Sequence, residues 1–456
     1  MTNKPVAIIG AGIAGLTAAN CLRRQGVPIV LFEAGDKIAG MAQSYADEDG
    51  FTYDFGAHFI TNRLAAAIGI GSQCRDVKYY GESVSVRGRN YKYPLGLMSV
   101  PRFVASAVKA KLSGSGEANT AAEHFRRTYG RTLADEVALP ILEAWSGAPG
   151  DQLAASVGNK FSHSVAYTLY LSMLSRLKGL AVSSGYCRAI AENPQVWHVY
   201  PEGGMAGVCN KLAEPIQDAV RLRSPVEKIF VEDGRVVAVR AKGVEHTVSA
   251  VVSTAPCPFL PKLVTGTDCL KPLEAFRFRP MIFVNLRLKG RGILPDTVLW
   301  MPEGKYPFFR LTETTQSMPW LAPAGKTIVT CDIGCEVNDE HWRMTDEQLS
   351  ALCLEKLSEL YPEVSANYLG CRVMKTPFAY PVFLQSYEEQ RVRFEKSTGI
   401  DNLISIGRNG EFAHILMEDI YWSTLKKMQT LVDRLRTARD VPEPQHEEEF
   451  AGEMAY

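Results

Sequence analysis

Residues 6–15, Val-Ala-Ile-Ile-Gly-Ala-Gly-Ile-Ala-Gly, decide the fold of this 456-residue chain. A short apolar run leads directly into the glycine pattern, and a helical pattern follows as far as Gly26. A second apolar run, from Pro28 to Phe32, ends on Glu33. A strand, a glycine turn, a helix and a second strand in this order predict a βαβ nucleotide-binding unit.

The three glycines and the acidic residue each have a separate role in such a unit. Gly10 permits the tight turn between strand and helix, Gly12 lets backbone N–H groups approach a pyrophosphate, and Gly15 lets the helix pack closely on the strand. Glu33 can accept both hydroxyl groups of an adenosine ribose, and its charge would repel a 2′-phosphate. The unit therefore predicts dinucleotide binding with NADP as the least suitable ligand, and it leaves FAD and NAD open.

Length and composition exclude several other classes of protein. A chain of 456 residues, 46% of them hydrophobic, can form two or more domains around a large core. Its 50 basic and 50 acidic residues cancel, so no overall charge favours nucleic acid or an anionic membrane. The ten cysteines are scattered, and the closest pair, Cys331 and Cys335, lacks a C-x-x-C partner, so we expect no metal site.

The N-terminus enters the first strand within a few residues and leaves no room for a signal peptide, which favours a soluble, cytoplasmic enzyme. The most lipophilic helical stretch, residues 161–182, is interrupted by polar residues such as His163, Arg176 and Lys178. We therefore expect no membrane span. Core packing is the simplest role for this stretch, and a substrate pocket or a shallow membrane patch is the alternative.

Hydrophobic periodicity divides the rest of the chain into segments. Residues 79–93 alternate as strands do, with 88–90 as the expected hairpin turn, and residues 101–187 follow a helical pattern typical of an inserted subdomain. Thr345 and Gln348 form the capping box of a predicted helix. Further strands are predicted at 226–231, 236–241, 247–254, 282–288, 308–312 and 327–333.

A second glycine turn lies near the C-terminus. The apolar run 402–406 leads into Gly407-Arg408-Asn409-Gly410, and a helical pattern extends from about Met417 to Leu435. The positive end of a helix can lie against the carbonyl edge of a flavin and stabilise the negative charge gained on reduction. An ordinary strand-to-helix connection explains the same residues equally simply. Residues 441–456, rich in Pro and Glu, are predicted to be disordered.

Short segments spread over nearly the full length resemble the FAD-dependent amine oxidase and protoporphyrinogen oxidase superfamily, including its UDP-galactopyranose mutase-like branch. They are GAGIAG at 10–15, LFEAGDKIAG at 31–40, YDFGAHF at 53–59, YPEGGM at 200–205, VVSTAP at 251–256, PFFRLTE at 307–313, AYPVF at 379–383 and IGRNGEF at 406–412. The resemblance implies FAD rather than NAD. No cysteine follows Cys371, so the C-terminal covalent flavin link of some members is not possible and the FAD is expected to be non-covalent.

The resemblance implies an α/β fold, with a Rossmann-like FAD-binding domain of the GR2 type and a mixed α+β substrate domain that carries a helical insert. The expected FAD domain is discontinuous. It comprises residues 1–78, 195–270 and 395–440, and the substrate domain comprises 79–194 and 271–394. A monomer or a homodimer that binds a small-molecule substrate is expected.

The resemblance also places the cofactor contacts. The ADP half is expected to contact Gly10, Gly12, Ile13, Ala14, Gly15, Glu33 and Ala34, and the backbone of Val226 is expected to meet the adenine. The flavin half is expected to contact Gly40, Met41, Gly56, Ala57, His58, Gly407, Arg408, Asn409 and Met417. His58 and His414 are the candidates for proton abstraction. Arg310 is a candidate for binding a substrate carboxylate or phosphate, and a structural ion pair is the alternative.

Three departures from the family pattern bear on the activity. Ala39-Gly40-Met41 replaces the usual Gly-Gly followed by Arg or Asn. Ala413-His414-Ile415 stands where mutases carry a tyrosine pair, and residues 280–285 lack the lysine of classical amine oxidases. The leading hypothesis is an oxidase, dehydrogenase or desaturase that removes a hydride from a small organic substrate. The alternatives are a redox-neutral nucleotide-sugar mutase and a flavin-bound chaperone or binding protein.

Overall fold

A five-stranded parallel sheet carries the glycine motifs in the computed structural model, which describes residues 4–56, 59–112, 116–161, 165–183, 187, 190 and 193–437. In spatial order its strands are β10 (Val220–Arg221), β2 (Ile29–Phe32), β1 (Val6–Ile9), β14 (Ala250–Ser253) and β21 (Leu403–Ser405). The three central strands are short and apolar, as expected for strands covered on both faces. Segments about 400 residues apart in the chain therefore share one sheet.

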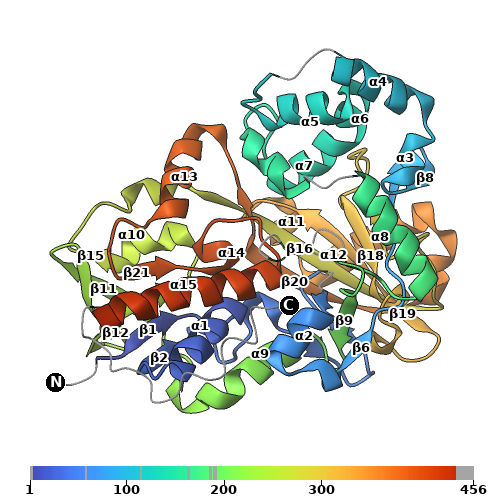
Figure 1. Cartoon of the computed structure of the whole chain (residues 1–456). Helices are drawn as coiled ribbons and strands as arrows, with labels where there is room; N and C mark the ends of the chain where they lie inside the picture. Colours follow the sequence, from blue (N-terminus) through green and yellow to red (C-terminus); the bar gives the residue numbers. More distant parts are fainter. Residues whose placement is uncertain are drawn as a thin grey trace.

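Helices cover one face of this sheet. Leu16, Ala19 and Leu22 of α1 (Ile13–Arg24), predicted to share one face, are completely buried. The helix is buried on its other sides as well, because α9 (Ala206–Ala213) and α15 (Met417–Thr437) pack on it, and α15 runs beside α1 (Figure 1). The opposite face meets the strands β11 (Val226–Glu232), β12 (Arg235–Ala241), β13 (Val244–Thr247) and β15 (Val264–Thr265).

A seven-stranded mixed sheet forms the second half of the molecule. Its order is β20 (Tyr368–Val382), β16 (Arg277–Lys289), β19 (Lys326–Gly334), β18 (Arg310–Glu313), β17 (Val298–Trp300), β7 (Glu82–Val86) and β8 (Arg89–Lys92). Every pair is antiparallel except β17 with β7. The pairing of β20 with β16 shifts register at two points. At one of them Thr376 faces Met281 but Tyr380 faces Arg279, so β20 bulges between them.

Helices and small sheets complete the fold. Above the second sheet lies a helical group (Figure 1) of α3 (Leu95–Met98), α4 (Pro101–Leu112), α5 (Ala121–Tyr129), α6 (Arg131–Leu133) and α7 (Leu139–Ser146), followed by α8 (Val165–Lys178). The small sheets join β3 (Tyr45–Ala46) to β4 (Thr52–Tyr53), and β9 (His198–Pro201) to β5 (Ile60–Thr61) and β6 (Cys74–Asp76). The remaining helices are α2 (Asn62–Ile68), α10 (Leu260–Leu263), α11 (Glu340–Arg343), α12 (Asp346–Leu360), α13 (Glu388–Lys396) and α14 (Gly407–Gly410).

Most predicted elements form, with three differences. The capping box at Thr345 starts α12 as predicted. The turn of the β7–β8 hairpin lies at Arg87-Gly88 rather than at 88–90, because both residues adopt the positive φ that a two-residue hairpin loop requires. The predicted run 247–254 divides between the end of β13 and β14, and the long strand β20 was not predicted.

Two further expectations concern the C-terminal tail and a membrane span. The predicted disordered tail, 441–456, lies outside the described residues. Among the helices that are described, none has both the length and the apolar character needed to cross a membrane.

We predict that Asn402 is a structural anchor for β21, the strand that leads to Gly407. Its buried side chain accepts from Val236 N at 2.7 Å and donates to Val236 O at 2.9 Å and to Ser249 O at 2.8 Å. Asn402→Ala leaves these buried backbone groups without partners, so the free energy of unfolding should fall by about 3 kcal/mol in urea titrations. Asn367→Ala, which removes one surface bond to Glu363, is the control and should change it by less than about 1 kcal/mol. Equal losses would contradict the prediction.

Candidate active site

Close packing explains two of the three glycines that open the chain. Gly10 has a φ of +97°, and a Cβ there would lie 2.1 Å from Thr254 Oγ1. A Cβ on Gly15 would lie 1.9 Å from the carbonyl oxygen of Gly10. Neither position can carry a side chain without moving the strand-to-helix turn.

Gly12 is different, because it faces open space. A Cβ on Gly12 would meet nothing nearer than Ala39 O at 4.0 Å. Gly12 is the N-cap of α1, and no side chain caps this helix end. The space and the uncapped N–H groups of Ile13 and Ala14 fit the pyrophosphate of a dinucleotide.

Glu33 lies at the end of β2, beside the same turn. One carboxylate oxygen accepts from Ala11 N and the other from Gly35 N, each at 2.7 Å. Each oxygen keeps a second lone pair for a ribose hydroxyl. The backbone of residues 223–224 donates to Gly35 O and Glu33 O, which brings the start of β11 and its Val226 to this end of the sheet. Ala34 is exposed beside them.

The Ala39-Gly40-Met41 segment closes over the glycine turn. Ala39 N donates to Ala11 O at 2.8 Å, and Ala39 holds a φ of +88° without being a glycine. Gly40 stands close to Gly12, since a Cβ on it would lie 3.6 Å from the Gly12 Cα. The Met41 sulfur accepts a hydrogen bond from Thr376 of β20 at 3.5 Å. The residue that replaces the family's usual polar contact therefore links the nucleotide-binding turn to the second sheet.

The C-terminal glycine turn meets the N-terminal one. Gly407 has a φ of +78°, and a Cβ on it would lie 2.9 Å from the Cβ of Ala14. Arg408 Nε donates to Ile415 O at 3.2 Å, just before Met417 starts α15. The two motifs proposed to hold opposite ends of the cofactor are thus in contact.

An aromatic cluster lies next to this junction. The His414 ring lies between those of Trp145 and Phe383, with ring centroids at 4.8 and 4.3 Å. The Tyr380 ring meets Trp145 at 4.9 Å, and the guanidinium of Arg408 stands 5.8 Å from the centre of that tyrosine ring. We call these four residues, Trp145, Tyr380, Phe383 and His414, the ring cluster.

Arg310 forms a buried ion pair. Its Nε donates to Asp332 Oδ2 at 2.7 Å, and a second guanidinium nitrogen contacts the same oxygen. Burial by itself would lower the pKa of Arg310, but the charge and hydrogen bond of Asp332, together with the nearby Tyr380 and Tyr80, raise it. Arg310 also stands over Trp300 at 5.3 Å, and a Cβ on Gly56 would lie 3.4 Å from Arg310 Nη2. The predicted Gly56 and Arg310 are therefore neighbours, and the ion-pair alternative describes Arg310.

Asp54 fixes the turn that leads to Gly56. Its carboxyl group accepts hydrogen bonds from Ser44 Oγ and from the backbone of Met205, and Ser44 Oγ accepts from Ala206 N at 3.0 Å. Burial raises the pKa of Asp54 to about 7, although both hydrogen bonds oppose the rise. Sequence reasoning missed this residue, which stands two positions before the quoted Gly56.

Ala57 and His58 lie outside the described residues, so their predicted roles are not addressed by these contacts. Sequence reasoning also missed Asp332, the partner of Arg310. The sequence shows that Asp332 lies among the apolar residues of a predicted strand, but it does not show which residue pairs with it.

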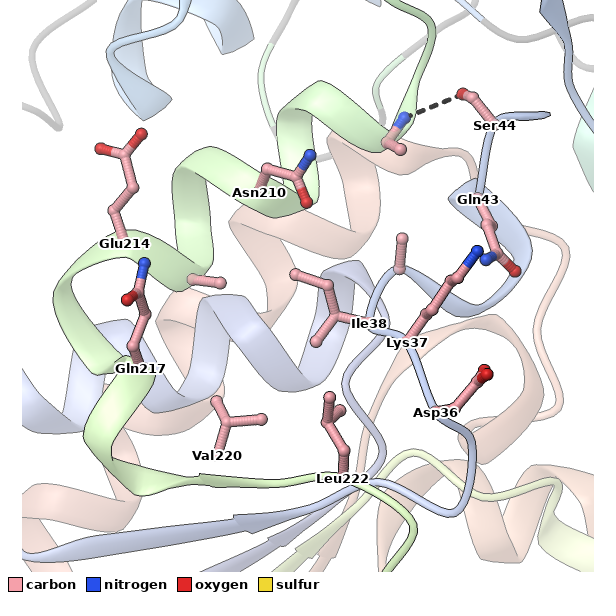
Figure 2. Close-up of a pocket in the computed structure, with 13 residues that line it drawn as sticks. Asp36, Lys37, Ile38, Gln43, Ser44, Asn210, Glu214, Gln217, Val220 and Leu222 are labelled. Carbon is pink, nitrogen blue, oxygen red and sulfur yellow. Dashed lines mark hydrogen bonds between the residues drawn. The ribbon is translucent and has the colours of Figure 1, made fainter. Parts of the chain in front are cut away.

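A pocket of about 680 Å³ lies on loop 36–44 (Figure 2). Its other walls are α9, the segment after it, and β10. Ile38, Val220 and Leu222 form its apolar part, and Lys37, Asn210 and Gln217 are among its polar residues. No residue of the ring cluster lines it. The pocket shares Ala39 with the cofactor loop but is separate from the ring cluster.

Comparison with known proteins gives the family. The model of the family described as flavin-containing amine oxidoreductase matches residues 13–407. Phytoene desaturase (lycopene-forming) from Pantoea ananas is 39% identical over 83 residues, 18% of this chain and 17% of that enzyme. Protoporphyrinogen oxidase 2, chloroplastic/mitochondrial, from Arabidopsis thaliana is 25% identical over 180 residues, 34% of this chain and 35% of that enzyme. The matched stretches thus span about a third or less of these curated relatives.

A solved structure matches over much more of the chain. The crystal structure of reduced UDP-galactopyranose mutase has a TM-score of 0.75 and 17% identity, with 94% of each chain covered. At this identity the match shows the fold alone. The fold is the mixed α/β fold of FAD-dependent amine oxidases and mutases, as predicted, and the division into domains stays a prediction.

The chain belongs to the flavin-containing amine oxidoreductases, a family of FAD-dependent oxidoreductases. FAD is its cofactor, which confirms the prediction made from residues 10–15 and 406–412 together. The FAD contacts predicted residue by residue stay predictions.

We predict that Gly12→Ala weakens FAD binding without unfolding the protein. The new methyl group meets no protein atom within 3.9 Å but occupies the space proposed for the pyrophosphate. The Kd for FAD, measured by flavin fluorescence, should rise about tenfold or more. Gly71→Ala, also in open space but far along the chain, is the matched control and should leave the Kd unchanged. Unchanged binding by Gly12→Ala would refute the placement.

We predict a pH-dependent contribution from Asp54. Because its folded-state pKa of about 7 lies above that of an unfolded Asp, near 3.9, its contribution to stability is complete below about pH 4 and is lost as pH rises through 7. Asp54→Asn should therefore gain stability relative to the wild type between pH 4 and 7, by up to about 4 kcal/mol, in denaturant titrations. Asp36→Asn, an exposed change in the neighbouring loop, should give a difference that is independent of pH. A pH-independent difference for Asp54→Asn would contradict the prediction.

Proposed function

We propose that this chain is an oxidase, dehydrogenase or desaturase for a small, flat and largely apolar organic molecule. Bound FAD supplies the acceptor for a hydride taken from a substrate C–H bond. The observation that carries the proposal is the ring cluster at the Gly407–Arg408 turn, with Arg310 already neutralised by Asp332.

The protein residues bind and orient such a substrate. The half-buried Tyr380 ring, held at an angle against the buried Trp145, offers a surface that favours a flat apolar molecule. The charge of Arg310 is already balanced by Asp332, so an anionic substrate would gain less from this guanidinium than from an unpaired one. The site therefore favours a substrate without a carboxylate or phosphate at this point.

His414 is proposed to hold the proton released at the substrate. Its place between Trp145 and Phe383 fixes the plane of the imidazole ring. His58 stays the second candidate on sequence grounds. The phytoene desaturase relative acts, by its name, on phytoene, an apolar molecule, which supports the same substrate class.

A redox-neutral nucleotide-sugar mutase is the alternative, since the mutase has the same fold. Its substrate carries a diphosphate. The compensated Arg310 and the Ala413-His414-Ile415 segment supply neither an available cation nor a tyrosine pair for that group. A cytoplasmic location and a monomeric or homodimeric state remain predictions from the sequence.

The deciding experiment is anaerobic reduction of the FAD-loaded protein with polyenes, porphyrinogens, amines, amino acids and nucleotide sugars. Bleaching of the flavin absorbance by polyenes or porphyrinogens is expected. Turnover of a nucleotide sugar that requires prior reduction and consumes no oxidant would establish the mutase instead. Flavin that stays oxidised with every compound would refute the enzymatic proposal.

We predict that Tyr380 binds substrate through its ring rather than through its hydroxyl group. With a substrate found by that screen, Tyr380→Ala should raise KM about 30-fold, because about 2 kcal/mol of ring contact is lost. Tyr380→Phe keeps the ring and should stay within about threefold of the wild type. FAD content, measured by absorbance, should be unchanged in both variants. A large effect of Tyr380→Phe would show that the hydroxyl group carries the contact.

A further inference from the structure

The balanced overall charge hides a strong local separation. Residues 83–116 contain six Lys or Arg and no Asp or Glu, and residues 152–191 contain four and none. The remainder of the chain holds 40 basic against 50 acidic residues. Two segments that include α3, α4 and α8 are therefore purely basic in a protein that is otherwise acidic.

The same two segments hold most of the exposed large hydrophobic side chains in the described part of the chain. Of the sixteen large hydrophobic side chains that are exposed in the described part of the chain, ten lie in them. On α4 the exposed residues Val104, Val108 and Leu112 are spaced by four and form one stripe. Leu112 is 82% exposed. A solvent-facing helix side is normally polar, and this one is apolar.

Helix α8 repeats the pattern. Its exposed residues Tyr170, Met173 and Leu177 share one side at helical spacing, and Leu177 is 76% exposed. Among the α8 side chains that the structure describes, Leu171 alone is buried. Much of this helix therefore faces outward, and its exposed surface includes an apolar and aromatic stripe beside Arg176 and Lys178.

The two helices lie on the same side of the molecule. Figure 1 shows α3, α4 and α8 at the upper right, on the side away from the nucleotide-binding sheet. The charge of Arg176 on α8 acts on Tyr79, whose hydroxyl group donates to Asp296. Lys92, at the end of β8 just before α3, pairs with the same aspartate at 3.6 Å. The C-terminal end of α8 is thus connected to the segment that carries α3.

Charged groups of both signs lie around the stripes. Glu136 faces α4 from the next helical segment, and it pairs with Arg102 at 2.5 Å and with Arg87 at 3.3 Å. Asp296 is buried against Lys92. The cations exposed beside the stripes are Lys109, Lys111, Arg176 and Lys178. Glu136 and Asp296 therefore pair with Arg87, Arg102 and Lys92, and the four lysines and arginines beside the stripes keep their rim basic.

We propose that α3, α4 and α8 form a docking surface for the headgroup region of an anionic lipid bilayer. Exposed apolar stripes with basic flanks and no acidic residue are the pattern of helices that lie in a membrane interface. The apolar side chains enter the acyl boundary, and the lysines and arginines meet anionic headgroups. A second copy of this chain fits less well, because a symmetric contact would set two basic faces against each other.

Sedimentation of the FAD-loaded protein with vesicles tests the proposal. Binding to phosphatidylcholine vesicles that contain phosphatidylglycerol is expected, with weaker binding to phosphatidylcholine alone and loss of binding at high salt. The double variant Lys111→Gln with Lys178→Gln should bind about 25-fold more weakly, since each basic residue near the surface contributes about fivefold. Leu112→Ser with Leu177→Ser should weaken binding at least about tenfold.

Matched controls distinguish docking through these helices from non-specific hydrophobic adsorption to the vesicles. Val244→Ser with Val337→Ser removes two exposed apolar side chains outside these helices, and it should leave vesicle binding unchanged. Flavin absorbance checks that each variant is folded. The proposal is overturned if the wild type binds neither kind of vesicle, or if the control variant loses as much binding as the helix variants. It is also overturned if light scattering shows a dimer that Leu112→Ser with Leu177→Ser dissociates while lipid binding is absent.

Discussion

The contact between Gly407 and the first turn of α1 is the constraint on which the rest of the site depends. A glycine is required there because any Cβ would press against Ala14. The contact brings β21 and its following turn to the helix that starts at Gly12, although the two lie about 400 residues apart. The chain between these two turns forms the second sheet and the helical insert. It has to leave the nucleotide-binding sheet and return to it without disturbing this junction.

Local patterns were sufficient for the elements that build this junction. The opening βαβ unit, the capping box at Thr345 and the strand before Gly407 were all predicted, because periodicity and turn chemistry act over a few residues. Strand β20 was not predicted, and it contains Pro377 and Pro381, a residue type that is uncommon inside strands. It is the edge strand of its sheet, where a missing N–H costs little, and its prolines flank the bulge near Tyr380.

The parts of the site that are formed by backbone turns could be predicted from the sequence, whereas the side-chain pairs could not. A glycine turn can be recognised from the local sequence. No local pattern shows that Asp332 forms an ion pair with Arg310 or that Ser44 donates a hydrogen bond to Asp54. The whole-chain charge of zero suggested a surface without electrostatic preference. Charge acts over about 10 Å, so its distribution over single helices matters more than its sum.

The bulge in β20 gives this fold a way to change its substrate. Thr376, which bonds Met41, stays in register with β16, and Tyr380 resumes the pairing only after the extra residues. An insertion or deletion of one residue inside the bulge would turn the Tyr380 ring in a new direction. The pairing of β20 with β16 on both sides of the bulge would stay intact. Selection could thus reshape the binding surface by altering strand length at one point, with the cofactor-binding half of the molecule unaffected.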